Sequence, residues 1–291
     1  MDTNTLQAFL AVAATGSFSK AADQLFLTQS AISKRVALLE DQLNSKLFDR
    51  IGRTVTMTEA GTALLPRAKD ILLQLDDAKR LISNLNAGEI TGNFKLAASH
   101  HISLHRLPPL LKQYAEACPK VELDLEFAES EIAYEGVLKG DLELALITLS
   151  PEPDASIHSE IIWDDVLRYV VAKDHPLADC NTISLEQLNQ VNAILPGSNT
   201  FTRSLVEKLF QQHSLELNVS MSTNYLDTIR MMVSIGLGWS LLPDSLVNDD
   251  LCVLDVTDSE PVHRNLGIIY HRNRTLSNAA NYLVEMLRNE R

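Results

Sequence analysis

Three histidines lie close together in one short segment of the chain, at positions 100, 101 and 105. Neutral imidazoles bind metal ions, and imidazoles also titrate near neutral pH. We expect an extended segment here, in which His100 and His101 point to opposite faces, and no carboxylate or thiol at ligand spacing completes a metal-binding set. A metal site is therefore not predicted. A contact with a bound small molecule, a pH sensor and a structural or surface role remain open.

A second set of polar residues lies in the segment TQSAISKRVALLE, residues 28–40. Thr28 can cap a helix that runs to about residue 42, with an apolar stripe formed by Ile32, Val36, Leu39 and Leu43. The side opposite this stripe carries Gln29, Ser30, Ser33, Ala37 and Lys34. Glutamine can bond an adenine edge, serine can reach bases or phosphates, and a helix N-terminus favours phosphate. This face therefore suits the major groove of DNA, and an ordinary solvated helix face is the alternative.

The net charge of −13 at first argues against DNA binding. Residues 1–87 contain 10 Lys and Arg against 9 Asp and Glu, however, and residues 88–291 contain 15 against 29. The acidity thus belongs to the second part of the chain. A nearly neutral N-terminal part neither excludes nor supports a nucleic-acid surface.

The elements around this segment predict a winged helix-turn-helix. Helical spacing of apolar residues from Leu6 to Ala13 precedes Gly16, and a second short helix begins near Ser17 or Ser19. After the third helix, LFDRIGRTVTMTEAG has the alternation and turn residues of a small β-wing with Gly52 at its tip. Arg53 beside that tip is a candidate minor-groove contact, whereas an ion pair with a neighbouring acid competes for Arg50.

A long helix is predicted from Thr58 onward. Its apolar positions alternate by four and three, at Leu64, Ala68, Ile71, Leu75, Ala78, Ile82 and Leu85. Such a heptad seam predicts a partner helix, most simply from a second subunit, because a single helix has nothing local to pack on. Gly88 and Gly92 then indicate a hinge.

After this hinge, short apolar strands alternate with amphipathic helices, which predicts an α/β fold with a largely parallel sheet. A chain of 291 residues, 45% of them hydrophobic and 22% charged, is expected to form two domains with real cores.

No membrane span or signal peptide is recognisable, so a cytoplasmic protein is expected. The three cysteines form no CxxC pair and predict neither a disulfide framework nor a zinc site.

Two other classes of protein, an enzyme and a solute carrier, are alternatives. An enzyme in the α/β part finds little support, because the chain has no GxSxG elbow, no GxxxxGK loop and no GxGxxG after the first strand. A solute carrier would need the missing signal peptide and would leave the helix-turn-helix unexplained.

Over essentially its whole length the chain resembles the LysR-type transcriptional regulators. GSFSKAA, TQSAISKRV, LE, LFDR and MTEAG follow one another in the family's order and spacing, and KDHPLA and GLGWSLLP agree more loosely. Asn44 stands where the family usually has glycine, and asparagine tolerates the left-handed conformation of a helix end. The family's DNA contacts map onto Gln29, Ser30, Ser33, Lys34 and Arg53.

The resemblance implies a fold class and a set of partners. We expect α/β with an N-terminal all-α winged helix-turn-helix, a linker helix for dimerisation and a C-terminal, two-lobed, periplasmic-binding-protein-like domain. The corresponding ranges are 1–58, 59–87, 88–93 for the hinge and 94–291, with lobe I at about 94–162 and 267–291 and lobe II at about 163–266. The implied partners are promoter or operator DNA, a small-molecule effector, further copies of the chain in a dimer of dimers (a homotetramer), and RNA polymerase as a further candidate. No enzyme activity and no cofactor is expected.

In such a two-lobed domain the effector would bind between the lobes, beyond the carboxyl ends of the strands. The loops at these ends supply the candidate effector residues Ser99, His100, His101, Ile102, Thr148, Thr200, Phe201, Thr202 and Asn224. Hydroxyls near helix N-termini suit a carboxylate or another small anion.

Overall fold

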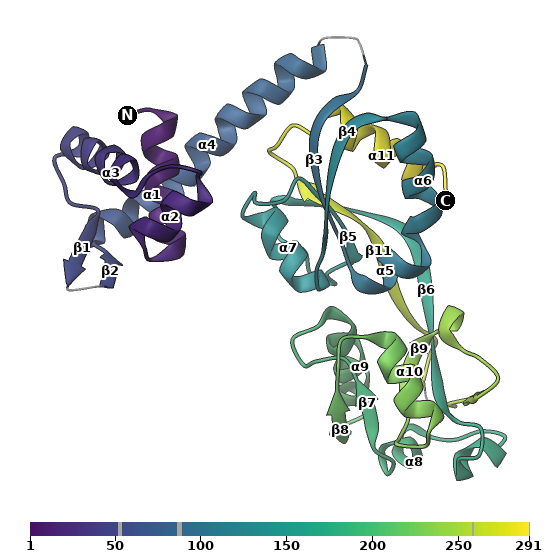
Figure 1. Ribbon diagram of the computed structural model, residues 1–291. Coiled ribbons are helices and arrows are strands. Elements are labelled where there is room, and N and C mark those ends of the chain that lie inside the picture. Colours follow the sequence, from purple (N-terminus) through teal and green to yellow (C-terminus); the bar gives the residue numbers. More distant parts are fainter. Residues whose placement is uncertain (52–53, 86–88, 258, 291) are drawn as a thin grey trace. The chain divides into compact units, whose positions relative to one another are not determined.

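The protein divides into two compact units. The computed structural model describes residues 1–51, 54–85, 89–257 and 259–290 (Figure 1). The first unit is Met1–Asn86 and the second is Ala87–Arg291. No helix in the described part of the chain is both long and apolar enough to cross a membrane.

The first unit is a helix-turn-helix followed by a hairpin and a long helix. Its elements are α1 Thr3–Thr15, α2 Phe18–Gln24, α3 Gln29–Leu43, β1 Phe48–Ile51, β2 Thr54–Met57 and α4 Glu59–Leu85. Ser17 and Thr28 cap α2 and α3 through their hydroxyls. Asn44 ends α3 with φ 50° and ψ 39°, so the left-handed conformation expected of this residue is confirmed.

The three short helices enclose an apolar core. Leu6, Phe9 and Val12 of α1 meet Ile32, Val36 and Leu39 of α3 in one buried cluster. The ring of Phe48, the first residue of β1, packs 5.4 Å from that of Phe9. Three of the four residues of the predicted apolar stripe of α3 therefore face inward, whereas the fourth, Leu43 at the end of the helix, is 39% exposed. The polar face of α3 is left to solvent.

Glu40 ties the end of α3 to the hairpin. This buried carboxylate accepts hydrogen bonds from the backbone N–H of Leu47, at 2.9 Å, and of Phe48, and it pairs with Lys46 at 2.7 Å. Burial alone would raise the pKa of Glu40, but these donors outweigh it and hold the pKa below its usual value. The hairpin is thereby held at a fixed place beside α3.

The long helix α4 differs from a simple coiled-coil seam. Ala68 is fully buried in the core of the first unit, and Leu64 and Ile71 pack against the same core. The expectation that the seam has nothing local to pack on is thus wrong for its first half, because α4 begins by packing against α1. In the second half, Leu75, Ile82 and Leu85 are 40%, 61% and 72% exposed.

The second unit contains two lobes joined by long strands. Its first half comprises β3 Thr91–Ala98, α5 His100–His105, α6 Leu107–Ala117, β4 Lys120–Phe127, α7 Ser130–Leu138, β5 Leu144–Thr148 and β6 Ile157–Ala172. The rest comprises η1 Pro176–Asp179, α8 Leu185–Asn189, β7 Ala193–Leu195, α9 Phe201–Gln212, β8 Val219–Ser222, α10 Leu226–Ser234, β9 Ser240–Pro243, η2 Asp244–Leu246, β10 Leu251–Val253, β11 Val262–His271 and α11 Asn278–Arg288. Residues 91–93, placed in the hinge by the sequence, belong to β3.

The main sheet is mixed, so the prediction of a largely parallel sheet is wrong. Its strand order is β10-β6-β11-β5-β3-β4, with β9 paired to β6. Among the described pairs, β3 runs parallel to β4 and β5, and β7 to β8, whereas every pair made by β6 or β11 is antiparallel. Apolar periodicity identifies strands but carries no information on the direction of their partners.

Each lobe has its own cores around this sheet. In lobe I, α6 and α11 cover one face, and the Tyr114 hydroxyl donates to the Ala279 carbonyl at 3.0 Å, while α7 packs on the other face. In lobe II, α8 and α9 pack on one side of β6, β7 and β9, and α10 packs on the other. Figure 1 shows β6 and β11 running from one lobe into the other, which makes them the connection between the lobes.

Candidate functional site

The exposed face of α3 carries four of the five residues singled out as DNA contacts. Gln29, Ser30 and Lys34 are exposed and Ser33 is half-buried, all in the first two turns of the helix. The hydroxyl of Ser30 lies 3.0 Å from that of the capping residue Thr28. The fifth candidate, Arg53, lies outside the described residues.

The turn before α3 also holds Phe26, which is 95% exposed and has a φ of 53°. No sequence pattern indicated this feature.

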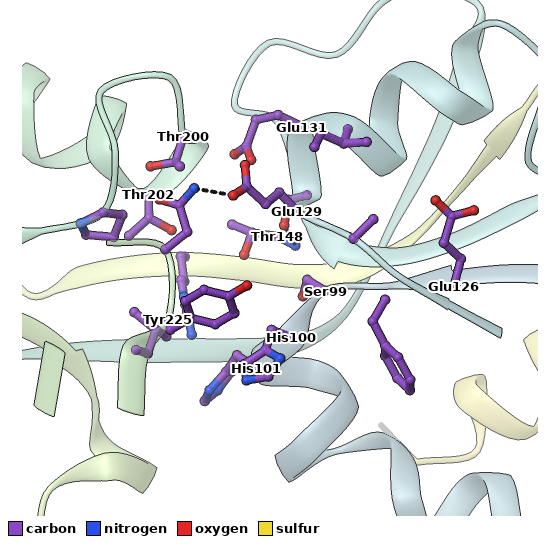
Figure 2. A pocket seen from close by; sticks show the side chains of 18 residues that line it. Ser99, His100, His101, Glu126, Glu129, Glu131, Thr148, Thr200, Thr202 and Tyr225 are labelled. Carbon is purple, nitrogen blue, oxygen red and sulfur yellow. Dashed lines mark hydrogen bonds between the residues drawn. The ribbon is translucent and has the colours of Figure 1, made fainter. Parts of the chain in front are cut away.

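A cavity of about 400 Å³ opens between the two lobes of the second unit, a size common for small-molecule sites (Figure 2). The predicted effector residues that line it are Ser99, His100, His101, Thr148, Thr200, Thr202 and Asn224. Two others do not line it. Ile102 is fully buried in the core of lobe I, and the ring of Phe201 packs against Tyr134.

The histidines lie on a helix, so the prediction of an extended segment is wrong. Ser99 is the N-cap of α5, and the Ser103 hydroxyl donates to the Ser99 carbonyl at 2.8 Å, which holds the first turn. The ring of His100 lies 5.0 Å from Tyr225 of lobe II, whereas the ring of His101 lies 4.8 Å from His105. Among the described residues no group of three or more His, Cys, Asp and Glu side chains is arranged to hold a metal ion.

His101 is a buried, neutral imidazole. It is 7% exposed, and neither ring nitrogen has a hydrogen-bond partner among the described residues. Burial, followed by the positive charge of Arg264 and other nearby basic side chains, lowers the pKa of His101 to about 3. Its Nε2 lies 3.9 Å from Asp165 Oδ2, which is too long for a hydrogen bond, and a neutral ring makes no ion pair there.

A buried ion pair lies where β6 and β11 pass between the lobes. Arg264 Nε donates to Asp165 Oδ2 at 2.7 Å, and Nη2 lies 2.6 Å from the same oxygen. The two residues are 4% and 3% exposed. Arg106 Nη2 lies 3.8 Å from the other carboxylate oxygen, so this cluster has two arginines for one aspartate, and Arg264 is its member that lines the cavity. This cluster could not be predicted from the sequence, because its members are distant in the chain.

Two glutamates of lobe I reach lobe II across the cavity. The backbone N–H of Phe201, at the start of α9, donates to Glu131 Oε1 at 2.6 Å. The Asn224 side-chain amide donates to Glu129 Oε1 at 2.6 Å, while its carbonyl accepts from the Gly197 N–H (Figure 2). Burial, with a smaller contribution from Glu129, raises the pKa of Glu131. Sequence reasoning missed both glutamates, since α7 shows only an ordinary amphipathic pattern.

Three of the buried hydroxyl-bearing residues that line the cavity have unused hydroxyl groups. Ser99, Thr148 and Thr202 are 8%, 7% and 7% exposed. No described residue makes a hydrogen bond to any of these three hydroxyls. Since buried polar groups are normally satisfied, the cavity offers unused donors and acceptors to a ligand.

Comparison with known proteins identifies the family. Residues 3–62 match the model of the bacterial regulatory helix-turn-helix protein, lysR family, and residues 87–291 match the LysR substrate binding domain. The chain is 32% identical over 286 residues to the HTH-type transcriptional activator CmpR of Synechocystis sp., covering 97% of this chain and 93% of that protein. An HTH-type transcriptional regulator of Azotobacter vinelandii is 61% identical over 109 residues, 38% of this chain and 75% of the relative. A full-length OxyR variant of Pseudomonas aeruginosa has the same fold, with a TM-score of 0.72, 25% identity and coverage of 99% and 98% of the two chains.

The two matches together span the helix-turn-helix that carries the exposed face of α3 and the two-lobed unit that contains the cavity. The chain is a DNA-binding regulator with an effector-binding domain and not an enzyme. It belongs to the LysR family of transcriptional regulators.

Proposed function

We propose that the protein binds promoter DNA through the exposed face of α3, and that a small molecule held between the two lobes modulates this binding. The observation that carries the proposal is the cavity itself, whose lining comes from both lobes. A ligand that contacts both lobes favours one arrangement of the lobes over another. Such a differential affinity is what an effector needs in order to shift a protein between two states.

The DNA contacts that we propose are Gln29, Ser30, Ser33 and Lys34, together with Arg53 of the wing. Gln29 in the first turn of α3 can make two hydrogen bonds to an adenine. The serines and Lys34 can position the helix by contacts to phosphates. Glu40 supports this arrangement, because it holds the hairpin beside α3.

The second half of α4 favours pairing with another copy of the chain. Leu81, Ile82 and Leu85 are 53%, 61% and 72% exposed, and such a row of apolar side chains on a long helix is typical of a coiled-coil partner site. We propose a dimer through this segment and a dimer of dimers on the DNA, with RNA polymerase as a further partner. Two linked reading helices raise the affinity of a module whose net charge is close to zero.

The effector that we propose carries a carboxylate or another small anion. Arg264 lines one end of the cavity, and in the cluster that it forms with Arg106 and Asp165 two arginines face one aspartate, which leaves one positive charge. The unpartnered hydroxyls of Ser99, Thr148 and Thr202 can donate hydrogen bonds to an anion.

Gel shifts with the DNA that flanks the protein's own coding region test the DNA-binding part. We expect binding whose affinity falls steeply as salt rises, because phosphate contacts release counterions. Gln29→Ala should weaken specific binding by about 1–3 kcal/mol, whereas Gln42→Ala, also exposed on α3, is the matched control and should change nothing. An affinity that does not depend on salt, or equal effects of the two variants, would contradict the proposed interface.

A further inference from the structure

The geometry points to an effector that carries a protonated amine as well as its anionic group, which makes it a zwitterion of the amino-acid class. This inference rests on the proposed function of the cavity and names the class of ligand that binds there. It assigns the amine to Glu129 and Glu131 on one side of the cavity and the anionic group to the side of Ser99, His101 and Arg264.

Two glutamates of the cavity lack a positively charged partner among the described residues. Glu129 and Glu131 each use one carboxylate oxygen to accept a hydrogen bond from a neutral N–H of lobe II. Neither carboxylate has a cationic partner within the described part of the chain. The second oxygen of each glutamate is therefore open to a donor, and the two like charges are left uncompensated.

The third glutamate of the cavity is different. Glu126 also contributes to the lining, but its carboxylate lies 3.7 Å from Lys95 Nζ on the neighbouring strand. Figure 2 shows Glu129 and Glu131 close together and Glu126 well apart from them. The unpaired negative charge is thus confined to the wall where lobe I meets lobe II.

The opposite wall has the complementary chemistry. His100, His101 and Ser99 lie across the cavity from Glu129 and Glu131, with Thr148 between the two groups (Figure 2). On this wall the Ser99 hydroxyl and the imidazole of His101, both in residues less than one-tenth exposed, have no hydrogen-bond partner among the described residues. Arg106 and Arg264 together exceed the charge of Asp165 by one.

Ligands of one charge fit only one of these walls. A dianion would bring a second negative group toward Glu129 and Glu131, and like charges at such a distance are strongly unfavourable in a partly buried site. A simple amine would leave the hydroxyls and the excess arginine charge without a partner. An ammonium group can donate three hydrogen bonds, so one group can serve both glutamates, while a carboxylate on the same molecule serves the other wall.

The test compares matched compounds on the full-length protein. The probes are the common α-amino acids, each paired with the carboxylic acid of the same skeleton that lacks the amine, for example glutamate with glutarate. Thermal shift identifies binders and calorimetry gives their affinities. We expect at least one amino acid to bind, and its partner without the amine to bind at least roughly tenfold more weakly, since a charge-assisted hydrogen bond is lost.

Three single substitutions locate the amine. Glu129→Gln and Glu131→Gln keep an oxygen that can accept the hydrogen bond from lobe II, but they remove the negative charge. Each should therefore weaken binding of the amino acid by roughly tenfold. Neither should weaken binding of the acid without the amine, because removing a glutamate charge relieves its repulsion of an anion. Glu126→Gln, on the same cavity but paired with Lys95, is the control and should leave both affinities as they are.

Equal binding of both members of every pair, or no binding by any amino acid, would overturn the proposal. Equal affinities of Glu129→Gln and the unchanged protein for the amino acid would do so as well. If the acids without the amine bind, and Thr202→Val weakens their binding, the cavity still holds an effector. Only the assignment of an amine to Glu129 and Glu131 then fails. If Thr202→Val leaves every measured affinity unchanged, the proposed function of the cavity fails with it.

Discussion

Arg264 on β11 and Asp165 on β6 stand opposite one another in the antiparallel ladder, and their side chains form a fully buried ion pair with an Nε–Oδ2 distance of 2.7 Å. Since β6 and β11 are the strands that continue from one lobe into the other, this pair lies at their passage between the lobes. It also borders the cavity through Arg264. The same contact therefore supports the fold and shapes the candidate site.

Removing one partner of this pair should destabilise the second unit strongly. Asp165→Asn leaves the Arg264 charge buried without its carboxylate, and we expect a loss of about 3–5 kcal/mol in the free energy of unfolding. Asp164→Asn is the matched control, because Asp164 is exposed and its pair with His263 at 2.9 Å should contribute less than about 1 kcal/mol. Urea unfolding followed by circular dichroism measures both values. Similar losses for the two variants would contradict a structural role of the buried pair.

His101 should make the second unit sensitive to acid. Its pKa is about 3 in the folded protein, and that of an unfolded histidine is near 6.5, so the unfolded chain takes up the proton first. The stability that the neutral ring contributes is complete above about pH 6.5 and falls as the pH drops toward 3. Between pH 7 and pH 5 we expect a loss of about 2 kcal/mol from this group.

The check is the stability of His101→Gln over the same range of pH. The variant should lose less stability than the unchanged protein between pH 7 and pH 5, because glutamine does not titrate. His213→Gln, at an exposed position, should follow the unchanged protein. Identical pH profiles for His101→Gln and the unchanged protein would show that His101 is not held neutral by burial.

The two halves of α4 should respond differently when a charged residue replaces an apolar one. Ile82→Asp places a carboxylate on the exposed segment, so we expect it to prevent pairing of subunits and weaken operator binding without lowering the stability of the first unit. Ile71→Asp should lower that stability as well, because Ile71 packs against the core around α1. Sedimentation velocity and thermal unfolding separate the two effects. Gln74→Asp is the control on the same helix, and a dimer retained by Ile82→Asp would refute the proposed pairing.

Local features were predictable from the sequence. The apolar stripe of α3 and its cap at Thr28 depend on residues a few positions apart, and so does the left-handed end at Asn44. These spacings fix the polar face of the helix. The half of α4 that packs on its own unit could not be predicted, because a heptad seam looks the same whether its partner is α1 or another subunit.

The site between the lobes was predictable only in part. Strand ends indicated Ser99, Thr148 and Asn224, all of which line the cavity. Glu131 and its contact with the Phe201 N–H, 70 residues away, depend on how the lobes close. The pair of Asp165 with Arg264, 99 residues away, depends on the register of β6 against β11. No local pattern encodes such distances. Ile102 was misplaced because the loop predicted after the first strand ran three residues into α5, where the Ile102 side chain turns into the core.

The most direct test of the central claim is the affinity for operator DNA with and without a cavity ligand. Fluorescence anisotropy with labelled operator, at one fixed salt concentration, should show at least a fivefold change in affinity when the best-binding amino acid saturates the protein, the lower end of typical coupling between sites. Thr202→Val should bind the operator as the unchanged protein does and lose most of this response. An operator affinity that stays the same at saturating ligand would contradict the account.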